Sequence, residues 1–224
     1  MVIGKTRVLP MTFDTKKTIF NKCYFKEEFF ERDFFFCADG NKVYLNHHCK
    51  ITFNLSFPFI KNFRNSVDVG CRDGEYTRFL QKYFNHTYCF DSRLSNFFPY
   101  NVNINKVSHF QCALGDENKV ITMSGGTHKK IPGYMYQTKC HRLDDLQLNN
   151  IDYLKVDVEG FEKKVIKGSI NTIKKNSPVI VIEQNDEVLE NEKKYEAKNF
   201  LEKNLDYKCV AICPRGWDYI MIKN

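Results

Sequence analysis

A short segment that joins a predicted strand to a predicted helix constrains the fold more than any other part of the chain. It reads Ser-Val-Asp-Val-Gly-Cys-Arg-Asp-Gly over residues 66–74. Val67 and Val69 are typical of a short buried strand, while Gly70 and Gly74 allow the backbone to turn tightly and to approach a ligand. An apolar helical pattern follows. This order of elements is the context in which α/β proteins bind nucleotide-like ligands, and it also suits a plain strand-to-helix connection.

The pattern after residue 65 predicts an α/β domain with a mostly parallel sheet. Strand-like and helix-like segments alternate, and the run from Pro178 to Glu183 is apolar up to its last residue, which is typical of a strand buried on both faces. Two final strands, at 207–212 and 219–222, are expected to form an antiparallel hairpin. The other expected strands cover residues 66–70, 87–91, 107–114, 119–123 and 153–158, and the expected helices cover 75–84, 161–175 and 191–204.

Residues 1–60 form a different region with short aromatic runs. A turn at 39–41 is followed by segments 42–45 and 51–55, which are rich in β-branched and aromatic residues and predict strands or a hairpin. We therefore divide the chain into a small N-terminal extension, residues 1–60, and a main domain, residues 61–224. The extension is interpreted as a contact for substrate or for a second copy in a homo-oligomer.

The composition favours a folded protein in a reducing compartment. The 224-residue chain is 42% hydrophobic and 15% aromatic, which argues against disorder. Nine cysteines are an odd number and lie mostly within apolar runs, so we expect free thiols and a cytoplasmic location. Cys37, His47, His48 and Cys49 are metal-ligating residue types, but they lack the paired spacing typical of zinc sites. No apolar run approaches the roughly 20 residues that span a bilayer.

Acidic residues end several predicted strands, at the edge where ligands of open α/β sheets bind. Asp91 lies about 20 residues after the glycine turn, where such folds place a ribose-binding carboxylate. Taken alone it is better suited to capping the next helix, but the glycine turn upstream favours ligand binding. Asp157 and Glu159 lie at the end of one strand, and Glu183 ends the next. Such carboxylates are costly unless they are solvated, cap a helix, bind a cation or accept a proton. We expect these last three side chains to converge.

Five strings occur in a characteristic order: Val67-Asp68-Val69-Gly70, Arg142-Leu143-Asp144-Asp145-Leu146, Leu154-Lys155-Val156-Asp157-Val158-Glu159-Gly160-Phe161-Glu162, Val165-Ile166-Lys167-Gly168 and Pro178-Val179-Ile180-Val181-Ile182-Glu183. Over about residues 65–185 the chain resembles the FkbM-type S-adenosylmethionine-dependent methyltransferases. The block that ends at Glu162 is the most specific part. The resemblance implies a Rossmann-like class I methyltransferase fold, with a seven-stranded, mostly parallel sheet whose last strand is antiparallel.

The resemblance also implies that S-adenosylmethionine is the cofactor. The matching positions are those of the methionine end (Asp68, Gly70, Cys71, Arg72, Gly74, Tyr76 and Thr77), the ribose (Asp91 and Ser92) and the adenine (Cys112 and Ala113). Two positions depart from the family pattern, which usually has Gly-Ala-Asn at residues 70–72 and Glu-Pro at residues 91–92. Arg72 therefore places a bulky cation near the cofactor's carboxylate.

The implied reaction is O-methylation of a sugar, a glycan or a small metabolite. Methyl transfer from a sulfonium is an in-line displacement, so the protein must align donor and acceptor and remove a proton. Asp157 is the first candidate for the base and Glu159 the second, with His128 or His141 as further candidates. Asp157, Glu159 and Glu183 are also candidate ligands for a divalent cation, Mg²⁺ or Mn²⁺.

Two other classes of function remain open. The first is a nucleic-acid methyltransferase. The net charge of +7 suits a nucleic-acid partner, and the set Lys155, Asp157 and Glu183 superficially resembles the lysine and acidic residues of RNA ribose methyltransferases. No basic tract with interleaved aromatic residues is present, so nucleic acid is the less favoured partner. The second class is a catalytically silent Rossmann-like interaction module, which a failure to bind cofactor would favour. The candidate substrate loops, residues 92–106 and 124–140, do not identify the acceptor.

Overall fold

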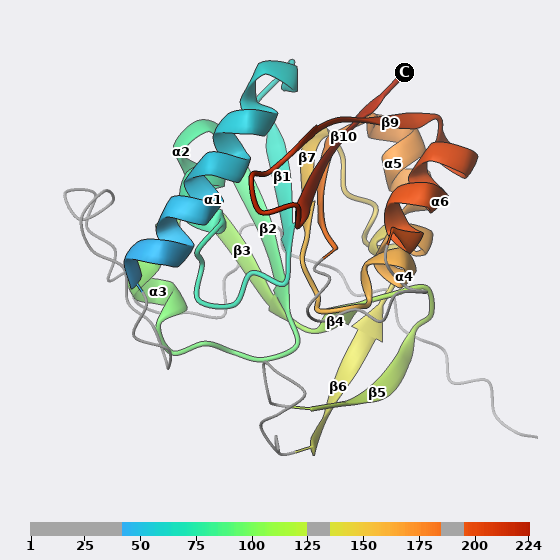
Figure 1. Ribbon diagram of the computed structural model, residues 1–224. Helices are drawn as coiled ribbons and strands as arrows, with labels where there is room; N and C mark the ends of the chain where they lie inside the picture. The colour runs from blue at the N-terminus through green and yellow to red at the C-terminus, as the bar shows by residue number, and fades with distance from the viewer. Residues whose placement is uncertain (1–41, 125–134, 185–194) are drawn as a thin grey trace, which may run out of the picture.

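The computed structural model describes residues 42–124, 135–184 and 195–224. Its centre is a seven-stranded sheet in the order β3-β2-β1-β7-β8-β10-β9 (Figure 1). All pairs from β3 to β8 are parallel, whereas β10 runs antiparallel to both β8 and β9. This confirms the predicted Rossmann-like sheet with a terminal hairpin. The strands are β1 (Asn65–Val69), β2 (His86–Asp91), β3 (Val107–Gln111), β7 (Ile151–Val156), β8 (Val179–Glu183), β9 (Tyr207–Ile212) and β10 (Asp218–Lys223).

Helices cover both faces of this sheet (Figure 1). On one face lie α1 (Lys42–Ser56), α2 (Thr77–Tyr83) and α3 (Phe98–Asn101), and on the other lie α4 (Glu162–Lys167), α5 (Ile170–Asn176) and α6 (Glu196–Leu205). The larger core packs Val67, Leu154 and Ile180 of the strands against α4, α5 and α6. A second core packs Tyr153 and Val181 against the α1–α2 face. Because β8 is buried on both faces, its sequence is apolar from Val179 to Ile182.

The predicted strands within residues 42–55 are wrong, because this segment forms helix α1. Thr52, Phe53 and Ser56 are buried and lie on one helical face, at spacings of one, three and four residues. Phe53 stacks on Phe79 at a ring-centroid distance of 6.3 Å. Burial of this face against α2 and the sheet outweighs the weak strand preference of the β-branched residues. The turn at 39–41 lies outside the described residues.

A second, three-stranded sheet has the order β4-β6-β5 and lies beyond one end of the main sheet (Figure 1). Its strands are β4 (Ala113–Leu114), β5 (Lys119–Ser124) and β6 (Met135–His141). The strand expected at 119–123 is therefore present, although in this smaller sheet. The strand expected at 107–114 is divided at Cys112, and β6 occupies part of a segment that we predicted to be a loop.

The remaining helix predictions need one correction. The helix expected over 161–175 is divided into α4 and α5 at Gly168, where a Cβ atom would lie 1.8 Å from the backbone oxygen of Gly115. Two short 3₁₀ turns, Phe57–Phe59 and Leu143–Leu146, complete the described structure.

Two further features concern the cysteines and the helices among the residues that the structure describes. All seven cysteines in these ranges are free thiols, as predicted. No helix within them has the length and apolar character that crossing a membrane requires.

Candidate functional site

The candidate site lies where the carboxyl ends of β1, β7 and β8 meet the beginning of β10. Register places Asp68 on β1 beside Lys155 on β7. It also places Glu183, the last residue of β8, opposite Asp218, the first residue of β10. Since β10 is antiparallel, its first residue reaches the same sheet edge as the last residues of the parallel strands.

A buried lysine lies at the centre of this edge. The Nζ atom of Lys155 is 2.9 Å from Asp157 Oδ2 and 3.9 Å from Asp218 Oδ1, and it lies 5.3 Å from the ring centroid of Tyr76. Burial alone would lower the Lys155 pKa, but the surrounding carboxylates, led by Asp157, raise it above its ordinary value. The ammonium group therefore stays charged.

The three carboxylates at the ends of β7 and β8 converge as predicted. Ligand oxygens of Asp157, Glu159 and Glu183 lie within 4.8 Å of one another. Burial raises the pKa of Glu183, and the charge of Asp157 raises it further. Burial would also raise the pKa of Asp157, but the Lys155 ammonium and a hydrogen bond from Glu183 lower it. Asp157 is consequently the charged member of the pair and Glu183 the protonated one.

Glu159 occupies a strained turn at the solvent-exposed rim. Its φ angle is 56°, and that of the following Gly160 is 103°. Partial burial of its carboxyl group and, second, the charge of Asp157 raise the pKa of Glu159 to about 7. Neither Asp157 nor Glu159 provides the cap considered above, because Glu162 Oε1 accepts the backbone N–H groups of Val158 and Gly160. A strained non-glycine residue of this kind is typical of functional sites.

The two glycines of the turn allow close contacts within the protein itself. Gly70 has a φ angle of +83°, and a Cβ atom there would lie 1.7 Å from the backbone oxygen of Asp157. A Cβ atom on Gly74, at φ +90°, would lie 2.7 Å from a methyl group of Val102. Asp68 lies beneath the turn, where it accepts a 2.6 Å hydrogen bond from Thr77 and burial raises its pKa to about 6.

Sequence reasoning missed Glu75, which lies directly after the second glycine. Its side chain is 8% exposed, and burial raises its pKa to about 8. The Oε2 atom accepts the backbone N–H of Asp73 at 3.1 Å, and Oε1 lies 3.9 Å from Nε of Arg72. Arg72 has a φ angle of 46°. The position of this acidic residue directly after Gly74 could have identified it as a candidate site residue from the sequence.

The predicted ribose and adenine positions surround the end of β2. Asp91 accepts the backbone N–H groups of Arg72 and Arg93, each at 2.9 Å, so it organises two loops rather than capping a helix. Ser92 is hydrogen-bonded to Tyr136 of β6 at 2.7 Å. Cys112 is buried in the core, and Ala113 begins β4.

Two predicted positions have side chains away from the candidate site. Cys71 is buried among Phe98 and Val102, so only its backbone can contact a ligand at the turn. His141 is half-buried on β6, its electrostatic neighbours are Lys139 and Asp145, and burial lowers its pKa. The candidate base His128 lies outside the described residues.

Helix α1 adds groups that sequence reasoning did not connect with this edge. His48 Nε2 lies 2.8 Å from Asp218 Oδ2, which also accepts a 2.8 Å hydrogen bond from Thr52. Farther along the helix, Ser56 is hydrogen-bonded to the Tyr153 hydroxyl, which is bonded in turn to that of Tyr76. Residues far apart in sequence therefore share one polar network.

Comparison with solved structures gives distant matches. The FkbM methyltransferase of Methylobacillus flagellatus is 16% identical, with a TM-score of 0.48, and the alignment covers 71% of this chain but only 43% of that longer one. Precorrin 8w decarboxylase of Methanobacterium thermoautotrophicum is 14% identical, with a TM-score of 0.47 and coverage of 84% and 92%. A proposed methyltransferase of Streptococcus mutans in complex with SAH is 10% identical, with a TM-score of 0.38 and coverage of 83% and 97%. No curated protein matches the chain.

Comparison with family models gives a match to the methyltransferase FkbM domain over residues 68–209. This range includes the glycine turn, the acidic ends of β2, β7 and β8, and most of the main sheet. Because it spans more than half of the 224 residues, the chain belongs to the methyltransferase FkbM domain family.

Proposed function

We propose that this protein transfers a methyl group from S-adenosylmethionine to a hydroxyl oxygen of a sugar, a glycan or a small metabolite. Family membership supports methyl transfer. The observation that carries the choice of cofactor is the excess of carboxyl groups over cations at the carboxyl edge of the sheet. Asp68, Asp157, Glu183 and Asp218 all act electrostatically on the single ammonium of Lys155.

This charge distribution suits a cationic ligand. S-adenosylmethionine carries a sulfonium and an ammonium group against one carboxylate. Burial raises the pKa values of Asp68 and Glu75 to about 6 and about 8. The neighbouring cations lower these values but do not offset the effect of burial. A cation that enters this edge would be stabilised by these carboxylates and would favour their ionised forms.

The turn and the end of β2 supply the proposed cofactor contacts. The backbone of residues 70–74 would contact the methionine end, with Arg72 close to its carboxylate and Glu75 close to its ammonium. Asp91 would accept the ribose hydroxyls, because each of its oxygens has a lone pair beyond the one used by a backbone amide. The short carbonyl contact at Gly70 keeps this turn close to Asp157.

Glu159 is the proposed base. A general base is most effective when its pKa lies near the working pH, and the pKa of about 7 at Glu159 meets this condition better than the lowered pKa of Asp157. The acceptor hydroxyl would give its proton to the Glu159 carboxylate while its oxygen attacks the methyl carbon. Bound S-adenosylmethionine would supply the methyl group in one in-line displacement, in which the carbon–oxygen bond forms as the carbon–sulfur bond breaks and the electron pair stays on the sulfur of the neutral thioether.

As the alternative to Glu159 acting as the base, the trio Asp157, Glu159 and Glu183 would bind a Mg²⁺ or Mn²⁺ ion. These hard cations prefer carboxylate oxygens, and such an ion would replace the proton held by Glu183. Its chemistry would be to polarise the acceptor hydroxyl.

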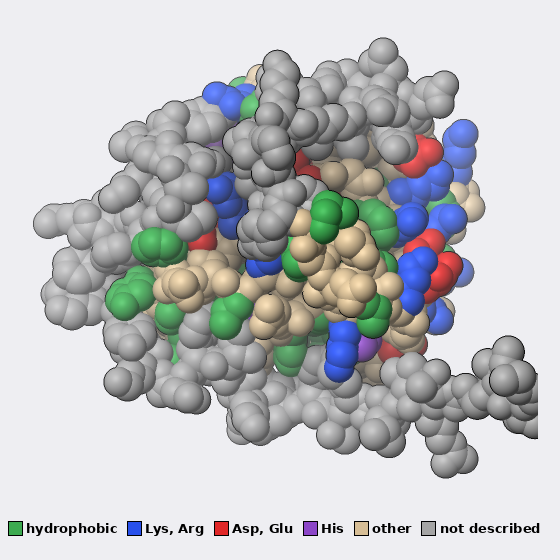
Figure 2. Space-filling view, turned by 90° about the horizontal axis from the view of Figure 1, so that it is seen from below, with side chains coloured by type: hydrophobic (Ala, Val, Ile, Leu, Met, Phe, Trp, Pro, Cys, Tyr) green, Lys and Arg blue, Asp and Glu red, His purple; other side chains and the backbone are tan. Residues whose placement is uncertain are grey.

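An RNA ribose is the alternative acceptor, since Lys155, Asp157 and Glu183 do lie together. The charges visible on one face of the molecule favour a smaller acceptor. On the face that Figure 2 shows, the described Lys and Arg side chains lie mainly along one side and are interspersed with acidic side chains, with no continuous basic patch among the described residues. Binding of a nucleic-acid backbone favours such a patch.

The proposal is tested by calorimetric titration with S-adenosylmethionine and S-adenosylhomocysteine, with and without Mg²⁺. Wild-type protein should bind both. Asp91→Asn should bind about 10- to 100-fold more weakly, because hydrogen bonds to a charged group contribute about 1.5–3 kcal/mol. Glu202→Gln, a change on α6 away from the site, is the matched control. Absence of binding by folded wild-type protein would favour the silent interaction module. If the wild-type protein does bind the cofactor, transfer of a labelled methyl group to glycans or to RNA would identify the acceptor.

A further inference from the structure

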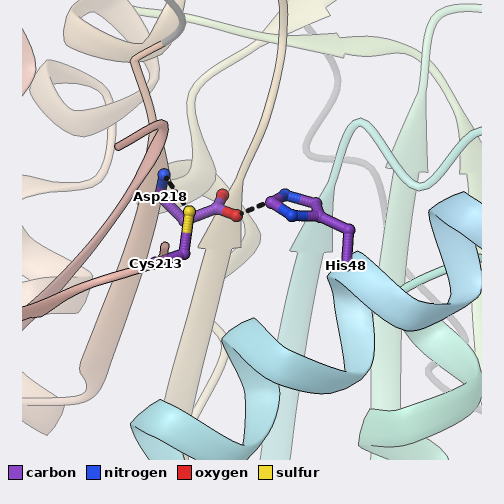
Figure 3. Close-up of side chains that lie close together, drawn as sticks. All are labelled: His48, Cys213 and Asp218. Carbon is purple, nitrogen blue, oxygen red and sulfur yellow. Dashed lines mark hydrogen bonds and ion pairs between the residues drawn. The ribbon is translucent and has the colours of Figure 1, made fainter. Parts of the chain in front are cut away.

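His48, Cys213 and Asp218 bring three metal-ligating atoms together beside the candidate site (Figure 3). They come from α1, from the turn between β9 and β10, and from the beginning of β10. The imidazole nitrogen, the sulfur and a carboxylate oxygen lie within 4.8 Å of one another. In Figure 3 the His48 ring points toward the Asp218 carboxylate, and the Cys213 sulfur lies next to it.

The backbone holds two of these side chains in fixed positions. The Asp218 N–H donates to Cys213 Sγ at 3.3 Å, and the Cys213 N–H donates to the Asp218 carbonyl at 2.9 Å. Gly216, at φ +78°, closes the turn with a 2.8 Å hydrogen bond to the Cys213 carbonyl. The sulfur and the carboxylate are therefore presented from one short turn that its own backbone hydrogen bonds hold together.

The three side chains are largely buried. Cys213 is 2% exposed, and the side chains of Asp218 and His48 are 3% and 15% exposed. Thr52 donates a hydrogen bond to the Asp218 carboxylate, which is the kind of support that orients metal-bound carboxylates. Burial separates this cluster from ordinary exposed acidic groups.

We propose that His48, Cys213 and Asp218 bind a divalent transition-metal ion of the zinc type. Nitrogen, sulfur and oxygen ligands together are typical of Zn²⁺, whereas Mg²⁺ prefers oxygen alone. Zinc–ligand bonds of about 2.0–2.3 Å place tetrahedral ligands roughly 3.3–3.7 Å apart. The present separations require only small side-chain movements, including a lengthening of the 2.8 Å His48–Asp218 contact.

Charge balance supports one ion. In the metal-bound form, the sulfur of Cys213 and the carboxylate of Asp218 would together neutralise Zn²⁺. The Lys155 ammonium lies 3.9 Å from Asp218 Oδ1, whereas His48 contacts the other oxygen, Oδ2. Three protein ligands leave a fourth position for water or a substrate oxygen. Bound metal would also tie α1 to the β9–β10 turn, so it should stabilise the fold.

The test is a Co²⁺ titration of the full chain after removal of metals with a chelator. Wild-type protein should bind one equivalent, with a near-ultraviolet thiolate-to-cobalt charge-transfer band that Zn²⁺ abolishes by displacement. Cys213→Ser should lose this band, and His48→Gln should bind at least about 100-fold more weakly. Cys209→Ser, which removes a half-buried thiol on β9, should match wild type.

The spectrum of the wild-type protein can overturn the proposal by itself, even where a variant fails to fold. Lack of Co²⁺ binding would refute it. Binding without a charge-transfer band would place the ion at the oxygen-only trio Asp157, Glu159 and Glu183, and would refute it as well. A charge-transfer band that persists in folded Cys213→Ser protein would also contradict it. As a second readout, Zn²⁺ but not Mg²⁺ should raise the melting temperature of wild-type protein, with no cofactor present.

Discussion

Replacement of Gly70 by alanine tests the contact that joins the glycine turn to the end of β7. A Cβ atom at this position would lie 1.7 Å from the Asp157 backbone oxygen, whereas real Cβ atoms essentially never approach other atoms within 3.0 Å. The oxygen and the turn must therefore separate by more than 1 Å. Gly216→Ala is the matched control, because its φ of +78° resembles the +83° of Gly70 but its Cβ meets no atom within 4 Å.

The two variants share one cost and differ in the other. An L-residue in the left-handed region costs roughly 1–2 kcal/mol, and Gly216→Ala should lose about this amount. Gly70→Ala adds overpacking of the core, which costs typically 1–3 kcal/mol and more when backbone must move. We therefore expect a loss of about 2–5 kcal/mol for Gly70→Ala.

Urea unfolding and thermal melting followed by circular dichroism measure both losses. In a chain of this size each kcal/mol lowers the melting temperature by about 2–4 °C. Gly70→Ala should melt roughly 4–20 °C below wild type, or fail to fold, and Gly216→Ala should melt about 2–8 °C below. Equal losses in the two variants would refute the argument, because the clash at the Asp157 carbonyl is the difference between them.

Three further predictions concern charge. Burial raises the pKa of Glu75 from 4.5 to about 8, so its contribution to stability is present below pH 4.5 and is lost as pH rises toward 8. Relative to Glu75→Gln, wild type should lose roughly 4–5 kcal/mol over this window in urea unfolding, and a constant difference would contradict the burial of this carboxyl. Lys155→Met should cost about 3–5 kcal/mol because it leaves buried carboxylates uncompensated, whereas Lys198→Met should cost less than about 1 kcal/mol; similar melting temperatures for the two would disprove a central role of Lys155. If Glu159 is the base, methyl transfer by wild type should increase as pH rises through about 7, and Glu159→Gln should lose about 10²- to 10⁴-fold in rate together with this increase. A pH–rate profile that keeps the same rise in the variant would assign the base elsewhere.

Local sequence was sufficient to predict an element whose residues all share one environment. The run Val179–Ile182 is apolar because β8 is buried on both faces. Parallel strands end at one edge, so the convergence of Asp157, Glu159 and Glu183 followed from their positions after strands.

Sequence reasoning failed where packing between distant segments decides the structure. Residues 42–55 have the β-branched and aromatic residues of strands, yet they form α1, because a helix lets Phe53 and Thr52 reach the sheet and Asp218. Strand β6 was missed because its pairing with β4 and β5 is set by segments outside its own sequence.

The sequence by itself determined the strands of the main sheet after residue 65, the acidic edge and the family, since these depend on short-range periodicity and on residue types at strand ends. Only the tertiary structure decided that Gly70 is needed for a contact with Asp157 and that Glu75 is buried. It alone brought His48 to Cys213 and Asp218. The physical reason is that these properties depend on distances between segments up to about 170 residues apart, which leave no trace in local patterns and arise only when the cores on both faces of the sheet are packed.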